Sequence, residues 1–161
     1  MLLIGGFFMG KILMLCASTT GNTELMAEAM VAYLKNTHHY QVVTKTFDFD
    51  PIDVEELLAY DAVLIGTHTW DDGELPYEVE DFYEELDDVD VKGRIFGVFG
   101  SADSFYDTYG GAVDLLGDHL NNLGAMLVPQ RLKVDLEPDR EDIQRCEAFV
   151  DVMLGMIREK A

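Results

Sequence analysis

The sequence lacks the features of a disulfide-rich, metal-binding or exported protein. Its two cysteines, Cys16 and Cys146, lie far apart, with no CxxC spacing and no histidine at a metal-ligand interval, so both are expected to be reduced and structural. Residues 1–8 are apolar but carry no positive charge and are too short to span a bilayer. A cytoplasmic protein without a membrane anchor is predicted, and the sequence leaves open whether Met1 or Met9 is the natural start.

Positive charge is also scarce. The chain has 11 Lys and Arg against 31 Asp and Glu, a formal net charge of -20, which argues against nucleic acid and anionic membranes as partners. Residues 46–91 and 95–130 contain no Lys or Arg. Such a distribution is either a solvated face or a field that speeds encounter with basic partners in a salt-dependent way.

Repeats, low-complexity tracts and flexible linkers are absent, so residues 1–161 are expected to form a single domain. Short apolar runs alternate with longer segments of helical period, which is typical of an α/β fold with a parallel sheet. Five strands are predicted, at residues 11–17, 40–47, 62–67, 94–100 and 125–134. The first, third and fourth are nearly continuously apolar, as strands covered on both faces are. The second alternates and the fifth contains Pro129, so both are predicted at edges.

Amphipathic helices are predicted between and after these strands. One begins with Pro76 at its first position and buries Val79, Phe82, Tyr83 and Leu86, which leaves an acidic outer face of Glu78, Glu80, Asp81, Glu84 and Glu85. Another opens at Pro138 and buries the stripe Ile143, Cys146, Val150, Met153 and Ile157. Gly124 is expected to end the preceding helix.

The turn after the first strand, CASTTGNTE (residues 16–24), is rich in small hydrogen-bond donors. A helix N-terminus binds an anion through backbone N–H groups and the helix dipole, so no cationic side chain is required. Gly21 would let the backbone close around a phosphate. The glycine and lysine patterns of other phosphate loops are absent. The alternative is an ordinary Ser/Thr-rich helix cap.

Aromatic residues follow the third and fourth strands. The turn GTHTWDDGELP (66–76) holds Trp70, the only Trp, which is either a stacking platform or a lid over a hydrophobic edge. The turn GSADSFYDTYGGA (100–112) holds Phe105, Tyr106 and Tyr109, and Asp103 could accept a hydrogen bond from a ring N–H. Because ligands bind at the carboxyl ends of parallel strands, a planar heterocycle with a terminal phosphate fits all three turns.

These motifs resemble those of short-chain flavodoxins from Lys11 to Met156: STTGNTE is similar to the family's phosphate signature, and TW and ADSFYDTYGGAVD are similar to its two aromatic loops. No insertion interrupts the fifth strand, as the long-chain type would require. The resemblance implies a flavodoxin-like three-layer αβα sandwich with a five-stranded parallel sheet of order 2-1-3-4-5. It also implies noncovalent FMN as the redox group.

The resemblance also implies roles for individual residues. The phosphate would be held by Ser18, Thr19, Thr20, Asn22 and Thr23 around Gly21. Trp70 and Tyr106 would stack on the two faces of the ring, with Asp103 near its pyrimidine edge. His68 and Thr69 would lie beside the ribityl chain, and Ser101, Ala102, Tyr109 and Gly110 would add contacts. Asp71 stands where many members have Gly, so we expect a less stabilised singly reduced flavin.

The function implied is low-potential, one-electron transfer without a substrate, so no catalytic residue and no metal site are expected. By this resemblance the donor would be a ferredoxin or flavodoxin reductase. The acceptor would be a P450, desaturase, nitric oxide synthase or ribonucleotide reductase activation system, and the residues do not rank them. A monomer is expected. The acidic residues of the three turns should disfavour the anion formed on full reduction.

Two other classes are weighed against this one. An FMN-dependent NAD(P)H quinone or nitro reductase on the same fold would need a second nucleotide site, and no basic residue or long loop for one is seen. A phosphorylation-driven receiver module would need an acidic pair after the first strand, where Cys16, Ala17 and Ser18 stand instead.

Overall fold

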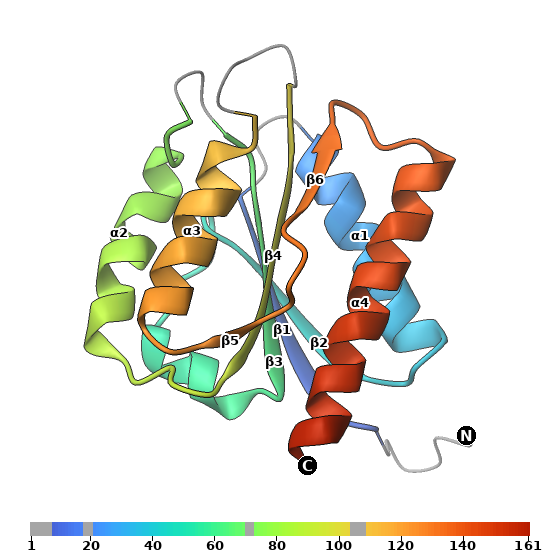
Figure 1. Cartoon of the computed structure of the whole chain (residues 1–161), viewed down its shortest axis with the longest axis horizontal. Helices are drawn as coiled ribbons and strands as arrows, with labels where there is room; N and C mark the ends of the chain where they lie inside the picture. Colours follow the sequence, from blue (N-terminus) through green and yellow to red (C-terminus); the bar gives the residue numbers. More distant parts are fainter. Residues whose placement is uncertain (1–7, 18–20, 70–72, 104–108) are drawn as a thin grey trace.

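The computed structural model describes residues 8–17, 21–69, 73–103 and 109–161. A parallel sheet lies between two layers of helices, with strand order β2-β1-β3-β4-β5 and β6 also paired to β4 (Figure 1). The predicted αβα sandwich of order 2-1-3-4-5 is confirmed. The strands are β1 Lys11–Ala17, β2 Gln41–Thr46, β3 Ala62–Thr67, β4 Ile95–Ala102, β5 Met126–Leu127 and β6 Leu132–Asp135.

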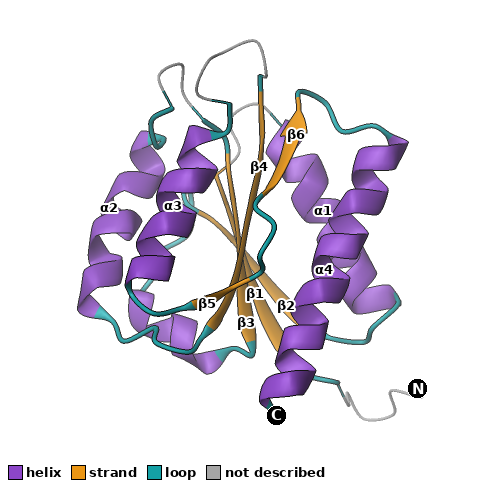
Figure 2. Ribbon diagram, viewed as in Figure 1, coloured by secondary structure: helices purple, strands orange, loops and turns teal. Residues whose placement is uncertain are grey.

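Two helices cover each face of the sheet (Figure 2). On one side lie α1 (Asn22–Asn36) and α4 (Arg140–Lys160), and on the other lie α2 (Tyr77–Glu85) and α3 (Gly111–Asn122). The connection from β2 to β3 contains the short 3-10 helix η1 (Val54–Ala59), and a second one, η2 (Leu86–Asp88), extends α2. None of the helices within the described ranges is both long and apolar enough to cross a membrane.

The central strands are buried on both faces, which explains their continuous apolar runs. In β1, Ile12 and Met14 belong to the core under α1 and α4, whereas Leu13 and Leu15 belong to the core under α2 and α3. The edge strand β2 has no fully buried residue. This difference in cover is the physical basis of the predicted central and edge positions.

The last predicted strand is divided in two. β5 pairs with the start of β4, at Ile95 and Phe96, and β6 pairs with its end, from Phe99 to Ala102. Pro129 lies in the interruption, where its missing N–H cannot contribute to the ladder. β6 therefore reaches the carboxyl end of β4, beside the third of the turns singled out in the sequence.

Three helix predictions are refined by the structure. Pro76 is the N-cap of α2 rather than its first residue, and α4 begins at Arg140, with Asp139 and Asp142 forming a capping box. Glu78 was expected on the outer face but is half-buried, because it lies beside the buried His68. Gly124 has a positive φ of 87° just past α3, as predicted for a helix terminator.

Candidate functional site

The three turns follow β1, β3 and β4, which are neighbours in the sheet. Since all strands are parallel, their carboxyl ends meet at one edge, and the chain changes winding direction between β1 and β3. The predicted site residues Ser18, Thr19, Thr20, Trp70, Asp71 and Tyr106 lie outside the described residues. The others, in the described ranges, come together at this edge.

The first turn leads into a helix whose start has no side-chain cap from the part of the chain that the structure describes. Gly21 is the N-cap of α1, with φ 86° in the left-handed region, and makes no capping hydrogen bond. A Cβ at Gly21 would meet no atom of the described residues within 4 Å. The first N–H groups of a helix have no intrahelical acceptor, and the helix dipole adds positive potential there. This helix start, with Asn22 and Thr23, can receive an anion.

The side chain of Thr23 is engaged inside the protein. Its Oγ1 accepts a hydrogen bond from the backbone N–H of Ser101 at 3.2 Å and lies 3.1 Å from Ser101 Oγ. Thr23 is fully buried and Ser101 is 5% exposed. The pair joins the start of α1 to the end of β4. What Thr23 offers to an anion is therefore its backbone N–H.

His68 lies in the first part of the second turn, directly after β3, and is only 5% exposed. Its Nδ1 is 3.1 Å from the carbonyl oxygen of Ala17, at the end of β1. Its Nε2 is 3.9 Å from Glu78 Oε1 on α2. His68 thus connects the ends of β1 and β3 to α2. These contacts hold the starts of the first two turns in place relative to each other.

The second and third turns are in direct contact. The backbone N–H of Ala112 donates to Thr69 Oγ1 at 3.1 Å. A Cβ on Gly111 would lie 2.8 Å from the Cα of Gly73, so only glycine permits this approach of the two backbones. Together the two contacts hold the segments before and after Trp70 against the start of α3.

The third turn begins from a strand end that is fully paired. The carbonyl of Ala102 accepts a hydrogen bond from Leu136 N at 2.8 Å, and Ala102 is in register with Asp135 of β6. Asp103 follows and is half-buried. Burial, followed by the charge of Asp135, raises the pKa of the Tyr109 hydroxyl, which therefore stays neutral at physiological pH.

Sequence reasoning missed a cation at this edge. Lys133 of β6 donates through Nζ to the carbonyl of Tyr109 at 3.2 Å and to Asp114 Oδ2 at 2.6 Å. A Cβ on Gly110 would lie 2.5 Å from Lys133 Cδ, so the lysine stem covers the backbone at Gly110. The three turns themselves carry no Lys or Arg, but the fold brings one from β6. The predicted strand order contained this signal, since Lys133 lies near the end of the strand beside β4.

The described residues form neither a reactive cysteine nucleophile nor a metal site. Burial, then the charges of nearby carboxylates, raises the pKa of the Cys16 thiol to about 12. Burial likewise raises the pKa of Cys146 to about 12, and both cysteines are free, as predicted. Across residues 8–17, 21–69, 73–103 and 109–161 no group of His, Cys, Asp or Glu could hold a metal ion. The start of α1 at this edge of the sheet instead favours the binding of an anionic ligand.

Comparison with known proteins identifies a family with this arrangement. The family model described as Flavodoxin matches residues 15–149. Probable flavodoxin 1 of Bacillus subtilis is 39% identical over 143 residues, which is 88% of each chain. Oxidised flavodoxin 1 of Bacillus cereus is 37% identical, with a TM-score of 0.84 over 90% of this chain and 97% of that one. A short-chain flavodoxin associated with a bacterial microcompartment is 31% identical, with a TM-score of 0.85 over 92% of this chain and 99% of that one.

Proposed function

The chain belongs to the flavodoxin family, and from this premise we propose how its residues hold the cofactor and meet its partners. Flavodoxins bind FMN and transfer electrons, so this chain is an FMN-binding electron carrier rather than an enzyme. When bound, FMN supplies a group that accepts and releases electrons one at a time. The protein's own residues bind and orient it and set its surroundings.

The FMN phosphate is assigned to the start of α1, at Ser18, Thr19, Thr20, Gly21, Asn22 and Thr23. The observation that carries this assignment is the helix start at Gly21, where no described residue provides a side-chain cap or lies within 4 Å of the Cβ position. An ordinary helix cap would use the side chain of the N-cap residue to satisfy these N–H groups, and Gly21 has none. A phosphate there would satisfy them and would interact favourably with the helix dipole.

The ring and ribityl chain are assigned to the second and third turns. Trp70 and Tyr106 would flank the ring, Asp103 would lie at its pyrimidine edge, and His68 and Thr69 would lie beside the ribityl chain. Asp71, Ser101, Ala102, Tyr109 and Gly110 would complete the contacts. The bond from Ala112 to Thr69 and the close approach of Gly111 to Gly73 support this assignment, because they hold the two turns together.

The charge of the chain favours a low reduction potential. Glu74 is exposed in the second turn, and Asp71, Asp72, Asp103 and Asp107 are in the second and third turns. Negative charge nearby disfavours a further negative charge on reduction. Lys133 opposes this effect, but its charge is largely compensated by Asp114 at 2.6 Å. The net effect we propose is electron transfer at low potential.

Redox partners follow from family membership, and their surface chemistry from the charge of the chain. A net charge of -20 favours transient docking on basic proteins. The proposed donor is a ferredoxin or flavodoxin reductase. The proposed acceptor is a P450, desaturase, nitric oxide synthase or ribonucleotide reductase activation system. We further propose that the chain acts as a monomer in the cytoplasm.

The test is a spectroscopic titration of the purified protein with FMN, followed by reduction. Binding of FMN with quenched flavin fluorescence is expected, as is reduction by NADPH only when a basic flavoprotein reductase is added. Failure to bind FMN at micromolar concentration would show that the start of α1 serves only as a helix terminus. Rapid oxidation of NADH or NADPH by the protein alone would instead indicate the quinone or nitro reductase activity.

A further inference from the structure

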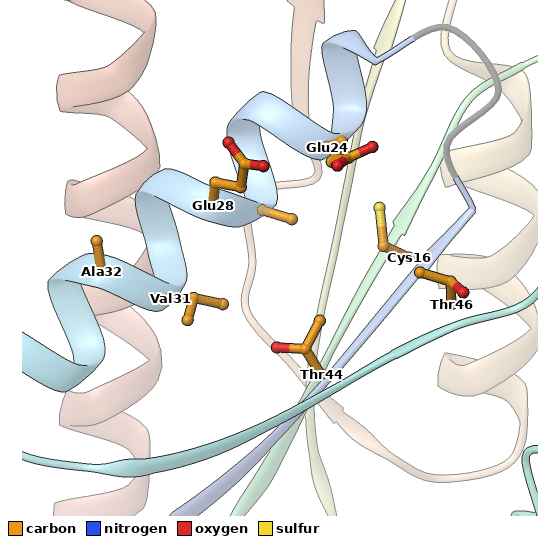
Figure 3. Close-up of a pocket in the computed structure, with 8 residues that line it drawn as sticks. Cys16, Glu24, Glu28, Val31, Ala32, Thr44 and Thr46 are labelled. Carbon is orange, nitrogen blue, oxygen red and sulfur yellow. The ribbon is translucent and has the colours of Figure 1, made fainter. Parts of the chain in front are cut away.

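A groove lies between α1 and the β1–β2 side of the sheet, on residues that have no assigned part in FMN binding (Figure 3). Its volume is about 320 Å³, which is within the size range of small-molecule sites. Its lining consists of Cys16, Glu24, Ala27, Glu28, Val31, Ala32, Thr44 and Thr46. The groove is thus formed by one face of α1 and by the carboxyl-terminal halves of the neighbouring strands β1 and β2.

The wall of the groove is mostly apolar. Cys16 and Ala27 form its buried floor, with 3% and 4% of their surface exposed. Val31 is half-buried and points toward Thr44 in Figure 3. An apolar body placed here would remove these groups from water, which is favourable in proportion to the area covered.

The charged groups of the lining are all carboxylates. Glu24 and Glu28 are both exposed and stand one turn apart on α1, a spacing at which like charges destabilise a helix. Figure 3 shows the Glu24 carboxylate on the side of the helix that faces the Cys16 sulfur, with Glu28 one turn farther along α1. Lys45 separates Thr44 from Thr46 on β2 but pairs with Glu56 at 2.9 Å, away from the groove.

The negative potential of these carboxylates reaches the floor of the groove. After burial, the charges of Glu24, Asp48 and Glu28 are the contributions that raise the pKa of the Cys16 thiol. A neutral apolar ligand would leave this potential uncompensated, and an anion would be repelled. A cation beside Glu24 and Glu28 would relieve their mutual repulsion.

We propose that this groove binds a small organic monocation with an apolar body, of the arylalkylammonium class. The body lies against Ala27, Val31 and Thr44, and the ammonium group lies beside Glu24 and Glu28. Both parts of the ligand are required, because the groove combines an apolar wall with an acidic rim.

The probe is phenethylammonium, added to the FMN-loaded, ¹⁵N-labelled protein at physiological ionic strength and followed by amide chemical shifts. Saturable shifts are expected at Ala27, Val31 and Thr44. Two matched probes separate the contributions: 2-phenylethanol keeps the ring without the charge, and butylammonium keeps the charge without the ring and imitates a lysine side chain. Phenethylammonium is expected to bind about tenfold more tightly than either probe.

Variants locate the site. Glu24→Gln with Glu28→Gln should abolish the preference for phenethylammonium over 2-phenylethanol, and Glu28→Gln alone should reduce it. Thr44→Trp should fill the groove and prevent binding, whereas Glu141→Gln on the exposed start of α4 should change nothing.

Equal binding of all three probes would overturn the proposal. It would also be overturned by shifts that spread over the acidic surface without saturating, or by phenethylammonium binding that keeps its wild-type affinity in the double Gln variant and in Thr44→Trp. Butylammonium binding as tightly as phenethylammonium would point to a basic side chain of a protein partner instead.

Discussion

The hydroxyl oxygen of Thr69 accepts a hydrogen bond from the backbone N–H of Ala112 at 3.1 Å. Thr69 follows β3 and Ala112 lies in the first turn of α3, so the bond joins the second turn to the third. The N-cap of α3 is Gly110, which makes no side-chain capping bond. Thr69 therefore provides the cap of α3 from a different part of the chain.

Replacement of this cap should destabilise the protein. Thr69→Val removes the acceptor with little change of shape, and we expect the free energy of unfolding of the apoprotein to fall by about 1 kcal/mol. Thr69→Ser keeps the oxygen and should stay near the wild-type value. Urea denaturation measures both. Equal stability of the Val and Ser variants would show that the bond to Ala112 has no net effect.

The close approach of Gly111 to Gly73 should be needed for FMN binding. In Gly111→Ala the new Cβ would lie 2.8 Å from Gly73 Cα and 2.9 Å from its carbonyl oxygen, so the backbones must separate. We expect FMN affinity to fall by about tenfold, as measured by flavin fluorescence quenching. The control is Gly155→Ala in α4, where the nearest described atom apart from the helix's own backbone is 3.9 Å away, at the end of Arg158. That variant should gain about 0.5–1 kcal/mol of stability with FMN affinity unchanged. Unaltered affinity in Gly111→Ala would contradict the prediction.

The buried pair Thr23 and Ser101 should show strong coupling. Thr23→Val leaves the Ser101 N–H without its acceptor, at a cost of about 1–3 kcal/mol in unfolding free energy. Ser101→Ala removes only a hydroxyl and should cost less. A double-mutant cycle is expected to give a coupling energy of about 0.5–3 kcal/mol. If the two effects simply add, the hydrogen bond between these side chains does not contribute to stability.

The buried thiols should make the protein less stable at alkaline pH. The pKa of Cys16 and of Cys146 rises from 9.0 to about 12 on folding, so between these values the unfolded chain has lost protons that the folded chain still holds. The free energy of unfolding must then fall as pH rises from 9 toward 12, with no contribution from these groups below pH 9.

The measurement is urea denaturation across this pH range under reducing conditions. The double variant Cys16→Ala, Cys146→Ala should show a shallower decline, although the raised pKa values of Tyr33, Tyr40 and Tyr109 leave part of it in place. At pH 8 a thiol reagent should react only after unfolding. Rapid labelling of the folded protein would refute the assignment of both cysteines as buried and inert.

Charge at the three turns should tune the potential at which bound FMN takes up its second electron. Neutralising Asp71, Asp72 and Glu74 with Asn or Gln should raise this potential by roughly 10 mV per charge at moderate ionic strength. Lys133→Met should lower this potential, because it removes the cation that lies beside Tyr109 in the third turn. A reductive titration measures both shifts, and Glu141→Gln serves as a distant control. An unchanged potential in the triple variant would refute the electrostatic argument.

The sequence alone determined the layers, the central and edge positions of the strands, and the edge of the sheet at which the ligand site is proposed. These follow from local patterns: β1 and β3 are continuously apolar because helices cover both faces, and Pro129 excludes a central position. The full strand order was implied only by the resemblance to flavodoxins. The residue types of the three turns, with their resemblance to flavodoxins, were sufficient to predict FMN.

Only the tertiary structure decided the partners of individual side chains. The hydroxyl of Thr23 meets Ser101 from 78 positions away, Glu78 turns toward His68, and Lys133 reaches Tyr109 because the last strand is divided. Periodicity predicts which face of an element is buried, but it contains no information on which residue of another element arrives there. These pairs depend on how the elements pack across the sheet. Packing must fill the core and also give its polar groups hydrogen-bond partners, and this requirement overrides local preferences.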